Sequence, residues 1–343
     1  MGYDNDIYVI SGGGGSDEWQ RPVDWLPIPD IATGEEVIYI LMAVYDVIGN
    51  FAAFKFRGDY TVDWGDGNIE NVTSGVKAEH SYDWADVGDV TSEGFRQALI
   101  KITPQAGSNL TYVDLSHYHS SVTASQVTQL MDVVMNIPNV SGGTSLYIGV
   151  SIVHGNCRRV WIKEIGAITS MASQFRYFYS LKSVPLFDTP NVTTFLDTFN
   201  RTYGLQKDSI PLFDMTNATT ISRMFENSST LPAIKLDATG VITADRVFMY
   251  NTCLADVHIT NMASVTNIVY IFWNCNSIQR CRLEGLTIGF DISNNQMSAT
   301  ALNEMFTLLG TANGAQSITI TGNYGAATCD QTIATAKGYT IVN

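Results

Sequence analysis

Two groups of side chains in this sequence are of types that bind metal ions. Asp63 and Asp66 lie in a Gly-rich turn, and carboxylate oxygens are ligands that Ca²⁺ prefers. His117 and His119 alternate along an expected strand, and His154 is a further histidine that the fold could bring near them. A histidine pair can begin a zinc site. Two carboxylates fall short of the roughly six to eight ligands of Ca²⁺, and no third and fourth zinc ligand follows at metal spacing. We therefore expect no metal and no cofactor.

The sequence contains none of the short motifs that mark common enzyme active sites. G-x-S-x-G, the Walker A motif, H-E-x-x-H and G-x-G-x-x-G do not occur. The glycines at positions 12–15 lack the lysine and following helix of a phosphate-binding loop, so we interpret them as flexible linker. A glycan-degrading enzyme needs two carboxylates about 5 to 10 Å apart in a cleft, and no motif proposes such a pair. We expect a protein without enzymatic activity.

Composition and charge limit the classes of partner. The 343 residues carry 33 acidic and 19 basic side chains, a net charge of -14, whereas phosphate binding needs clustered Lys and Arg. The longest apolar run, residues 37–44, is too short to cross a bilayer, and residues 1–16 show no secretory signal. The five scattered cysteines suit buried thiols of a reducing compartment. We expect cytoplasmic synthesis, no membrane insertion and no nucleic-acid partner.

Residues 1–34 are expected to form an extended arm, because they are rich first in Gly and then in Pro. Trp19 and Trp25 lie among the prolines and follow no helical or strand period. They must therefore bury against either the next domain or a neighbouring chain. As a hypothesis, Trp19 and Trp25 dock the arm to another protein.

Residues 35–104 contain short β-rich runs separated by turn signals, which predicts a β-sandwich. The Asp-Gly pair of DWGDG at residues 63–67 suits a tight hairpin turn, and HSY follows at residues 80–82. The expected strands are residues 37–44, 51–56, 60–64 and 98–102. These W-G-D-G and H-x-Y motifs resemble those of the PKD family of immunoglobulin-like domains. The resemblance implies a spacer or adhesion module.

Residues 105–343 contain an internal repeat of 23 to 26 residues, marked by five phenylalanines. An apolar residue follows each phenylalanine six positions later, and an alternating apolar pair then predicts a short strand with one buried face. The phenylalanines are Phe175, Phe199, Phe225, Phe248 and Phe272. The expected parallel strands lie near residues 183–187, 209–213, 233–237, 256–260 and 280–284.

Asparagine recurs just after the repeated phenylalanines. At a turn that recurs along a solenoid, a buried Asn side chain can hydrogen-bond backbone groups of the adjacent repeat. We predict an asparagine ladder formed by Asn200, Asn227, Asn251 and Asn274.

Two longer units bracket the repeats, and both contain Ser or Thr before Ala-x-x-Leu-like text. This pattern suits capped helices at residues 122–131 and 297–306. The repeat motif F-x-N-C-x-S-L is seen as FWNCNSI at residues 272–278 and as FENSSTL at residues 225–231. It resembles BspA-type leucine-rich repeats. The resemblance implies a mainly β protein with short helices, in which residues 105–343 form a right-handed solenoid with parallel strands.

The alternating strand pattern also predicts a row of outward-pointing side chains, because successive residues of a strand point to opposite faces. We hypothesise that this row binds a partner. It comprises Arg159, Trp161, Phe187, Phe213, Lys235, His258 and Arg282. Its aromatic part would form a larger apolar patch than a soluble monomer leaves bare, so a partner, a loop of the same chain or the β-domain must cover it.

BspA-type repeats occur in bacterial surface adhesins and, joined to PKD-like domains and Trp/Pro arms, in phage virion proteins. The resemblance implies a phage virion structural protein, a tail or capsid appendage. We expect the arm to contact other virion proteins and the repeat surface to recognise a host receptor, either protein or glycan. Homo-oligomerisation is left open. The alternative is an adhesin at the bacterial cell surface.

Overall fold

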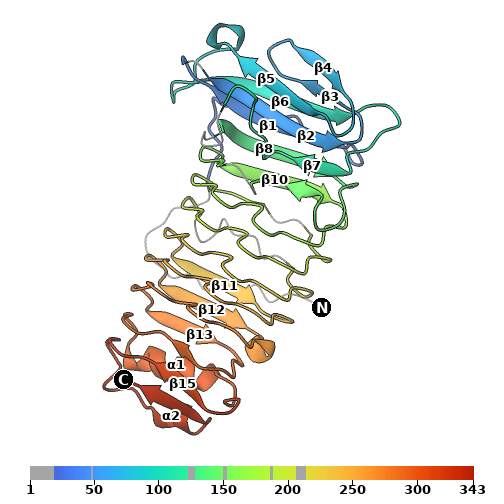
Figure 1. Ribbon diagram of the computed structural model, residues 1–343. Coiled ribbons are helices and arrows are strands. Elements are labelled where there is room, and N and C mark those ends of the chain that lie inside the picture. Colours follow the sequence, from blue (N-terminus) through green and yellow to red (C-terminus); the bar gives the residue numbers. More distant parts are fainter. Residues whose placement is uncertain (1–18, 48, 123–127, 150–152, 186–187, 206–213) are drawn as a thin grey trace.

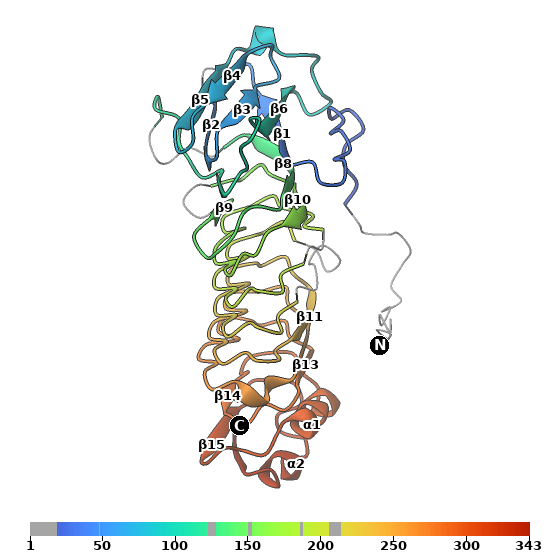
Figure 2. The ribbon, with the colours of Figure 1, turned by 90° about the vertical axis from the view of Figure 1, so that its right-hand side faces the viewer.

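The computed structural model describes residues 19–47, 49–122, 128–149, 153–185, 188–205 and 214–343. The molecule is elongated, with β-sheets at its N-terminal end, a column of stacked coils in the middle and two short helices at its C-terminal end (Figures 1 and 2). One hydrophobic core continues from the sheets through the coils to the C-terminal unit. The chain is mainly β, and its central part is a solenoid of parallel coils.

Two sheets form the N-terminal end. Strands β10-β8-β1-β6-β3-β4 make up a six-stranded sheet, and β5-β2-β7-β9 make up a four-stranded one. The strands are β1 (Val37–Val44), β2 (Asn50–Arg57), β3 (Tyr60–Asp63), β4 (Ile69–Val72), β5 (Lys77–Tyr82), β6 (Arg96–Pro104), β7 (Tyr112–Asp114), β8 (Leu130–Ile137), β9 (Leu146–Tyr147) and β10 (Arg159–Ile165). The four strands expected within residues 35–104 correspond to β1, β2, β3 and β6.

The DWGDG segment forms the turn that its glycines predict. Strands β3 and β4 pair antiparallel on either side of it, and Gly65 and Gly67 have φ angles of 78° and 95°. A Cβ atom at position 65 would lie 2.5 Å from the carbonyl oxygen of Leu99, so glycine is required there for space as well as for φ.

The six-stranded sheet continues past residue 104 into the solenoid. Strand β1 pairs antiparallel with both β6 and β8, and β8 pairs in parallel with β10. The helix predicted at residues 122–131 is wrong at its C-terminal end, because Leu130 and Met131 begin β8; residues 123–127 lie outside the described residues. All eight residues of β8 are buried, and an apolar run covered on both faces is typical of an internal strand.

Five coils follow, each marked by one of the repeated phenylalanines. Isolated parallel bridges join Ser170, Thr194, Thr220, Thr243 and Asn267 in succession. On another side of the column, β11 (Ala233–Asp237), β12 (Asp256–Thr260) and β13 (Arg280–Leu283) pair in parallel, which confirms the last three predicted strands. Ser183 forms a parallel bridge with Arg159, whereas residues 186–187 and 209–213 lie outside the described residues.

The five phenylalanines are buried and stack face to face along the column, as the repeat predicts. Successive ring centroids lie 5.1, 5.4, 6.1 and 5.9 Å apart, with interplanar angles between 6° and 16°. Each ring fills the interior of its coil and contacts its neighbours, so the stack joins the coils through their cores.

A compact unit follows the last coil. It contains β14 (Phe290–Asp291), β15 (Gln316–Thr319) and β16 (Tyr339–Val342), with α1 (Ala299–Leu308) and α2 (Thr332–Thr335) beside them. The predicted capped helix at residues 297–306 is confirmed, since Ser298 accepts a hydrogen bond from the Ala301 N–H at 3.2 Å. No helix within the described ranges is long and apolar enough to span a bilayer.

Candidate functional site

Three members of the predicted outward row form a continuous row on the parallel strands. Lys235 pairs in register with His258, and His258 with Arg282. Lys235 is exposed, whereas Arg282 donates to Asp256 at 2.7 Å and His258 Nε2 lies 2.5 Å from Glu284. We call Lys235, His258 and Arg282 the polar row; two of its three side chains already pair within the chain.

The other predicted members of the row differ from these three. Arg159 binds Asp132, and Trp161 is half-buried in a small cluster with Ile28 and Ile31 of the arm. The arm of the same chain therefore covers part of Trp161, whereas the sequence suggested a partner, a loop of the same chain or the β-domain as the cover. Phe187 and Phe213 lie outside the described residues.

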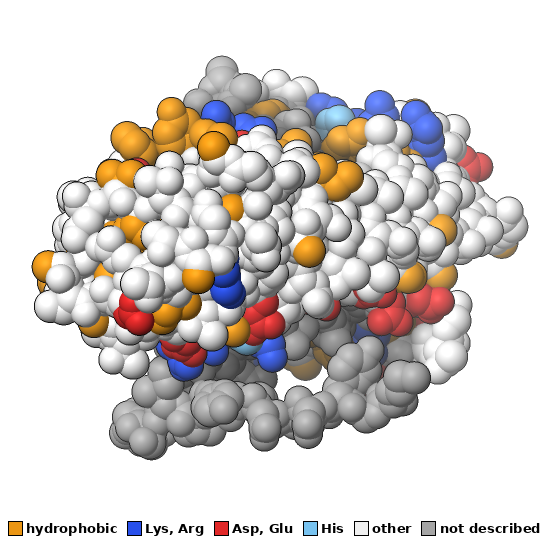
Figure 3. Space-filling model, turned by 90° about the horizontal axis from the view of Figure 1, so that it is seen from below, with side chains coloured by type: hydrophobic (Ala, Val, Ile, Leu, Met, Phe, Trp, Pro, Cys, Tyr) orange, Lys and Arg blue, Asp and Glu red, His pale blue; other side chains and the backbone are white. Residues whose placement is uncertain are grey.

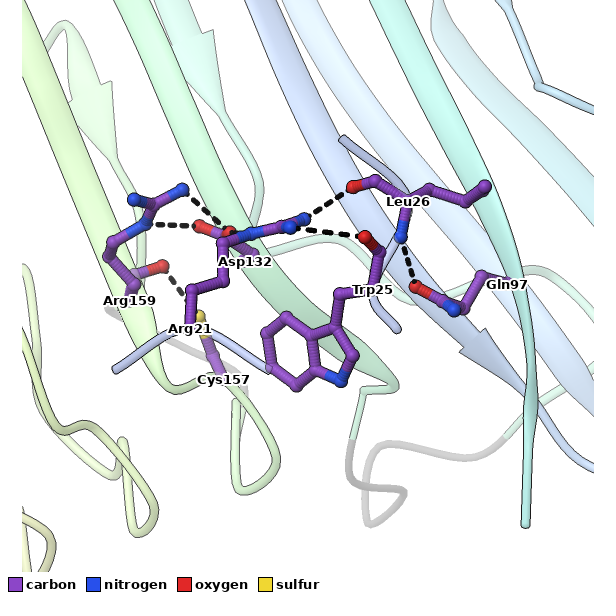
Figure 4. Close-up of polar contacts among 7 residues, drawn as sticks. All are labelled: Arg21, Trp25, Leu26, Gln97, Asp132, Cys157 and Arg159. Atoms are coloured by element: carbon purple, nitrogen blue, oxygen red, sulfur yellow. Dashed lines mark hydrogen bonds and ion pairs between the residues drawn. The ribbon is translucent and has the colours of Figure 1, made fainter. Parts of the chain in front are cut away.

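The arm packs along the outer face of the six-stranded sheet. Trp25 is 3% exposed and packs against Leu41, Phe95 and Met131 of the same chain. Figure 4 shows the polar contacts beside it, where the Leu26 N–H donates to Gln97 at 2.8 Å. The prediction that Trp25 docks to another protein is therefore wrong, because its own chain buries it. Trp19 is half-buried, with its ring centroid 6.1 Å from that of Trp25.

The buried ladder exists, but its members differ from those predicted. The residue three positions after a phenylalanine donates to the carbonyl oxygen of the preceding phenylalanine, at 2.7 to 2.9 Å. The donors of this side-chain ladder are Thr202, Ser228, Asn251 and Cys275. Burial raises the pKa of the Cys275 thiol to about 12, so the thiol keeps the proton that it donates.

Only Asn251 belongs to both the predicted and the observed ladder. Asn200 instead donates to Asp197 of its own coil at 2.9 Å and to Glu226 of the next coil at 3.3 Å. Asn227 and Asn274 occupy turn positions with φ angles of 59° and 58°, a left-handed conformation that asparagine tolerates better than most residues. Asn227 and Asn274 thus serve the turns, whereas Asn200 links two coils through side chains rather than through a backbone carbonyl.

The side chains first considered as metal ligands are engaged separately. Asp63 accepts from the Gly65 N–H at 3.0 Å, and Asp66 lies 2.6 Å from His80.

The strand expected at residues 117–119 is wrong, because β7 ends at Asp114. His117 contacts that aspartate at 3.1 Å. His119 stacks on Phe51, whereas His154 is fully buried elsewhere. No group of three or more potential ligands gathers within the described part of the chain.

Along the turns that carry the phenylalanines, backbone pairing between coils stops at Phe272. In each earlier coil, four alternate N–H groups donate to carbonyl oxygens of the next coil; around Phe248 the distances are 2.8 to 3.1 Å. The corresponding donors of the last coil have no acceptor among the described residues. They are the N–H groups of Ile268, Tyr270, Phe272 and Asn274. Strand β14 pairs instead with β15, so the column opens on this side.

An open groove of about 1020 Å³ lies where this pairing is missing. Tyr250, Tyr270 and Trp273 line it and are 39%, 51% and 49% exposed. The Trp273 and Tyr270 rings meet edge to face, with centroids 5.3 Å apart. We call this feature the aromatic groove.

The remaining lining of the aromatic groove combines uncharged polar residues with apolar ones. Asn274 and Asn276 are exposed, and their carboxamides have no hydrogen-bond partner among the described residues. The charged side chain in the lining is Asp291, which accepts from the Ser293 N–H at 2.8 Å. Viewed from the C-terminal end, the surface carries few charged side chains, and these lie mostly toward its edges (Figure 3).

The aromatic groove is not among the sites predicted from the sequence, although the sequence contains a signal for its rings. Tyr250, Tyr270 and Trp273 lie within two positions of a repeated phenylalanine, in turns where φ is 65° at Tyr250 and 61° at Tyr270. Large aromatic residues in such turns cannot share the buried position that the phenylalanine occupies. Their exposure follows from the repeat. The groove also requires that the backbone of the last coil lack hydrogen bonds to a following coil.

Comparison with known proteins gives one partial match. Residues 159–252 match the model of a family described as Mycoplasma protein of unknown function, DUF285. No curated protein and no solved structure matches the chain. The match covers coils marked by Phe175, Phe199, Phe225 and Phe248, and together with the parallel solenoid it fits a BspA-type repeat protein.

Proposed function

We propose that the chain is a non-enzymatic recognition protein whose solenoid presents a binding surface. The aromatic groove is the observation that carries this proposal. Three water-exposed rings lie at neighbouring turn positions. When a ligand covers these rings, their apolar surface leaves water, and this burial favours binding. The stacked coils hold these rings in place, and a preorganised surface loses little conformational entropy on binding.

The arrangement of the molecule suits attachment at one end and recognition at the other. The arm and the two sheets lie at the N-terminal end, and β14 lies near the C-terminal end (Figure 2). Both residues of β14 line the aromatic groove. We propose that the N-terminal sheets act as a PKD/Ig-like spacer, which the DWGDG hairpin supports. Docking to other proteins would then use the outer surface of the arm and sheets rather than Trp25.

The specific role that we propose is a structural protein of a phage virion, a tail or capsid appendage that recognises a host surface receptor. A bacterial surface adhesin of the same architecture is the alternative. Both roles need a rigid spacer that holds a binding surface away from its attachment point, and an elongated solenoid supplies one. The polar row is a second candidate surface, supported by the exposure of Lys235.

Localisation separates these roles. Antibodies raised against the folded chain should label purified phage particles in immunogold electron microscopy if the chain is a virion protein. Labelling of intact bacterial cells without particles would instead support the adhesin. Absence of label from both would reject the two surface roles, and release of reducing sugar from host glycans by the purified chain would reject a non-enzymatic protein.

A further inference from the structure

The exposed rings of the aromatic groove offer flat apolar faces at fixed positions. Tyr250 and Trp273 belong to adjacent coils, and the Tyr250 N–H donates to the Trp273 carbonyl at 2.8 Å. A pyranose sugar has an apolar face of C–H groups, and the electron-rich face of an aromatic ring attracts such hydrogens. Rings fixed on neighbouring coils can therefore stack against successive sugar units.

The groove also offers hydrogen-bonding groups beside these rings. The N–H groups of Tyr270, Phe272 and Asn274 are available donors, and the Asn274 and Asn276 carboxamides can each donate and accept. A sugar carries hydroxyl and ring oxygens around the edge of its apolar face. It can accept from the N–H row while its hydroxyls exchange hydrogen bonds with the carboxamides, so one ligand satisfies both kinds of surface.

The charge of the groove restricts the class of sugar. Asp291 is its charged lining residue, no Lys or Arg of the described part of the chain lines it, and the whole chain has a net charge of -14. Carboxylated, sulfated or phosphorylated sugars would meet repulsion without a compensating cation. From the rings, the donors and the charge together, we propose that the aromatic groove binds an uncharged oligosaccharide of pyranose units. This inference rests on the proposed recognition function and names its ligand class.

A glycan array tests the inference with the full chain. The probes are neutral glucans, mannans, galactans and N-acetylglucosamine oligomers, with sialylated and sulfated glycans printed beside them. A displayed library of random dodecapeptides is screened in parallel, because an extended peptide also carries acceptors for the N–H row. We expect binding to at least one neutral series. Hydrogen exchange at Tyr270, Phe272 and Asn274 should slow when that glycan is added.

Titration of the glycan that binds then locates the site. Trp273→Ala and Tyr250→Ala should each weaken binding by about 10-fold or more, and Trp273→Phe by less, because it keeps a flat ring. Tyr324→Ala is the matched control, since Tyr324 is 77% exposed and lies outside the groove; it should bind as the parent does. Thermal unfolding of all four variants checks that they are folded.

Four results would overturn the inference: no neutral glycan binds, charged glycans bind better, only peptides bind, or Trp273→Ala binds as tightly as the parent. A negative array together with immunogold label on particles or cells would reject the glycan and leave the recognition role standing. Absence of label together with neutral-glycan binding at Trp273 would reject the virion and cell-surface roles and leave the glycan site standing.

Discussion

Arg21 of the arm reaches Asp132 of β8, and its Nε atom lies 2.8 Å from the Asp132 Oδ2 atom. The Asp132 side chain is fully buried, and Arg159 of β10 donates to its two oxygens at 2.8 and 2.7 Å (Figure 4). Arg21 also donates to the carbonyl of Trp25 at 3.2 Å. One carboxylate thus connects the arm to two neighbouring strands of the sheet.

We expect Asp132→Ala to lower the free energy of unfolding by about 3 kcal/mol or more, because two guanidinium groups lose their buried partner. Arg21→Ala should cost less, since Arg21 is partly exposed and the Arg159 pair survives. Urea denaturation measures both losses, and limited proteolysis should show faster cleavage of the arm in Arg21→Ala. Equal losses in the two variants would mean that the Arg159 pair contributes little.

The phenylalanine stack predicts a large core effect. Phe225 is fully buried between Phe199 and Phe248, so Phe225→Ala should lower the free energy of unfolding by about 3 to 5 kcal/mol. Denaturation of Phe225→Ala and of the exposed-site control Tyr324→Ala would be compared under the same conditions. A loss below about 1 kcal/mol for Phe225→Ala would show that the stack collapses around the cavity.

The repeat could be predicted from the sequence because its period and its large apolar residues are local properties. The prediction named the wrong donors for the side-chain ladder, because the true donors differ in residue type. Thr202, Ser228 and Cys275 share with Asn251 a position three residues after the phenylalanine, not an amino-acid identity. The recurring asparagines therefore mark the turns instead of the ladder.

The arm and the groove depend on contacts between distant segments, which a one-dimensional pattern does not contain. The burial of Trp25 requires Phe95 and Met131, each about seventy residues or more away in sequence. The groove requires that β14 pair with β15 rather than with the coil of Phe272. Local propensity predicts neither choice, because each is decided by competing long-range pairings.

The side-chain ladder predicts a difference between two asparagines. Asn251 is fully buried and donates to the Phe225 carbonyl at 2.7 Å, so Asn251→Ala should cost about 1 to 3 kcal/mol by leaving that ladder position empty. Asn276→Ala is the matched control, because the Asn276 side chain is exposed and makes no hydrogen bond with described residues. Chemical denaturation compares the two. Equal stabilities would remove the ladder from the forces that join the coils.

The buried imidazole of His154 predicts a dependence of stability on pH. Burial lowers the pKa of His154 to about 4, because the charged form is poorly solvated. The neutral ring donates from Nε2 to the Ile148 carbonyl at 2.6 Å, and its Nδ1 accepts from the Thr128 hydroxyl at 2.5 Å. In the unfolded chain the pKa of histidine is about 6.5, so between about pH 6.5 and pH 4 the unfolded state binds a proton that the folded state does not.

His154 should therefore reduce the free energy of unfolding by up to about 3 kcal/mol as the pH falls through this window. Carboxylates titrate in the same range, so the measurement compares the parent with His154→Gln. The parent should be the more stable protein at pH 7, and the difference between the two should shrink toward pH 4. A difference that stays constant with pH would mean that His154 binds its proton over the same pH range in the folded chain as in the unfolded chain.

The two candidate surfaces predict opposite results in one attachment assay. The combined variant Lys235→Ala, His258→Ala and Arg282→Ala removes the polar row, whereas Tyr250→Ala with Trp273→Ala removes the rings of the aromatic groove. We expect the groove variant to weaken attachment of the labelled chain to host cells by about 10-fold or more, because exposed aromatic side chains are common anchors of binding surfaces. The polar-row variant should attach nearly as the parent does. Arg282 and His258 already pair with Asp256 and Glu284, and solvent-exposed charges contribute little to affinity.

Thermal unfolding would confirm that both variants are folded. If the polar-row variant alone loses attachment, the recognition surface lies on the parallel strands and the groove has another role.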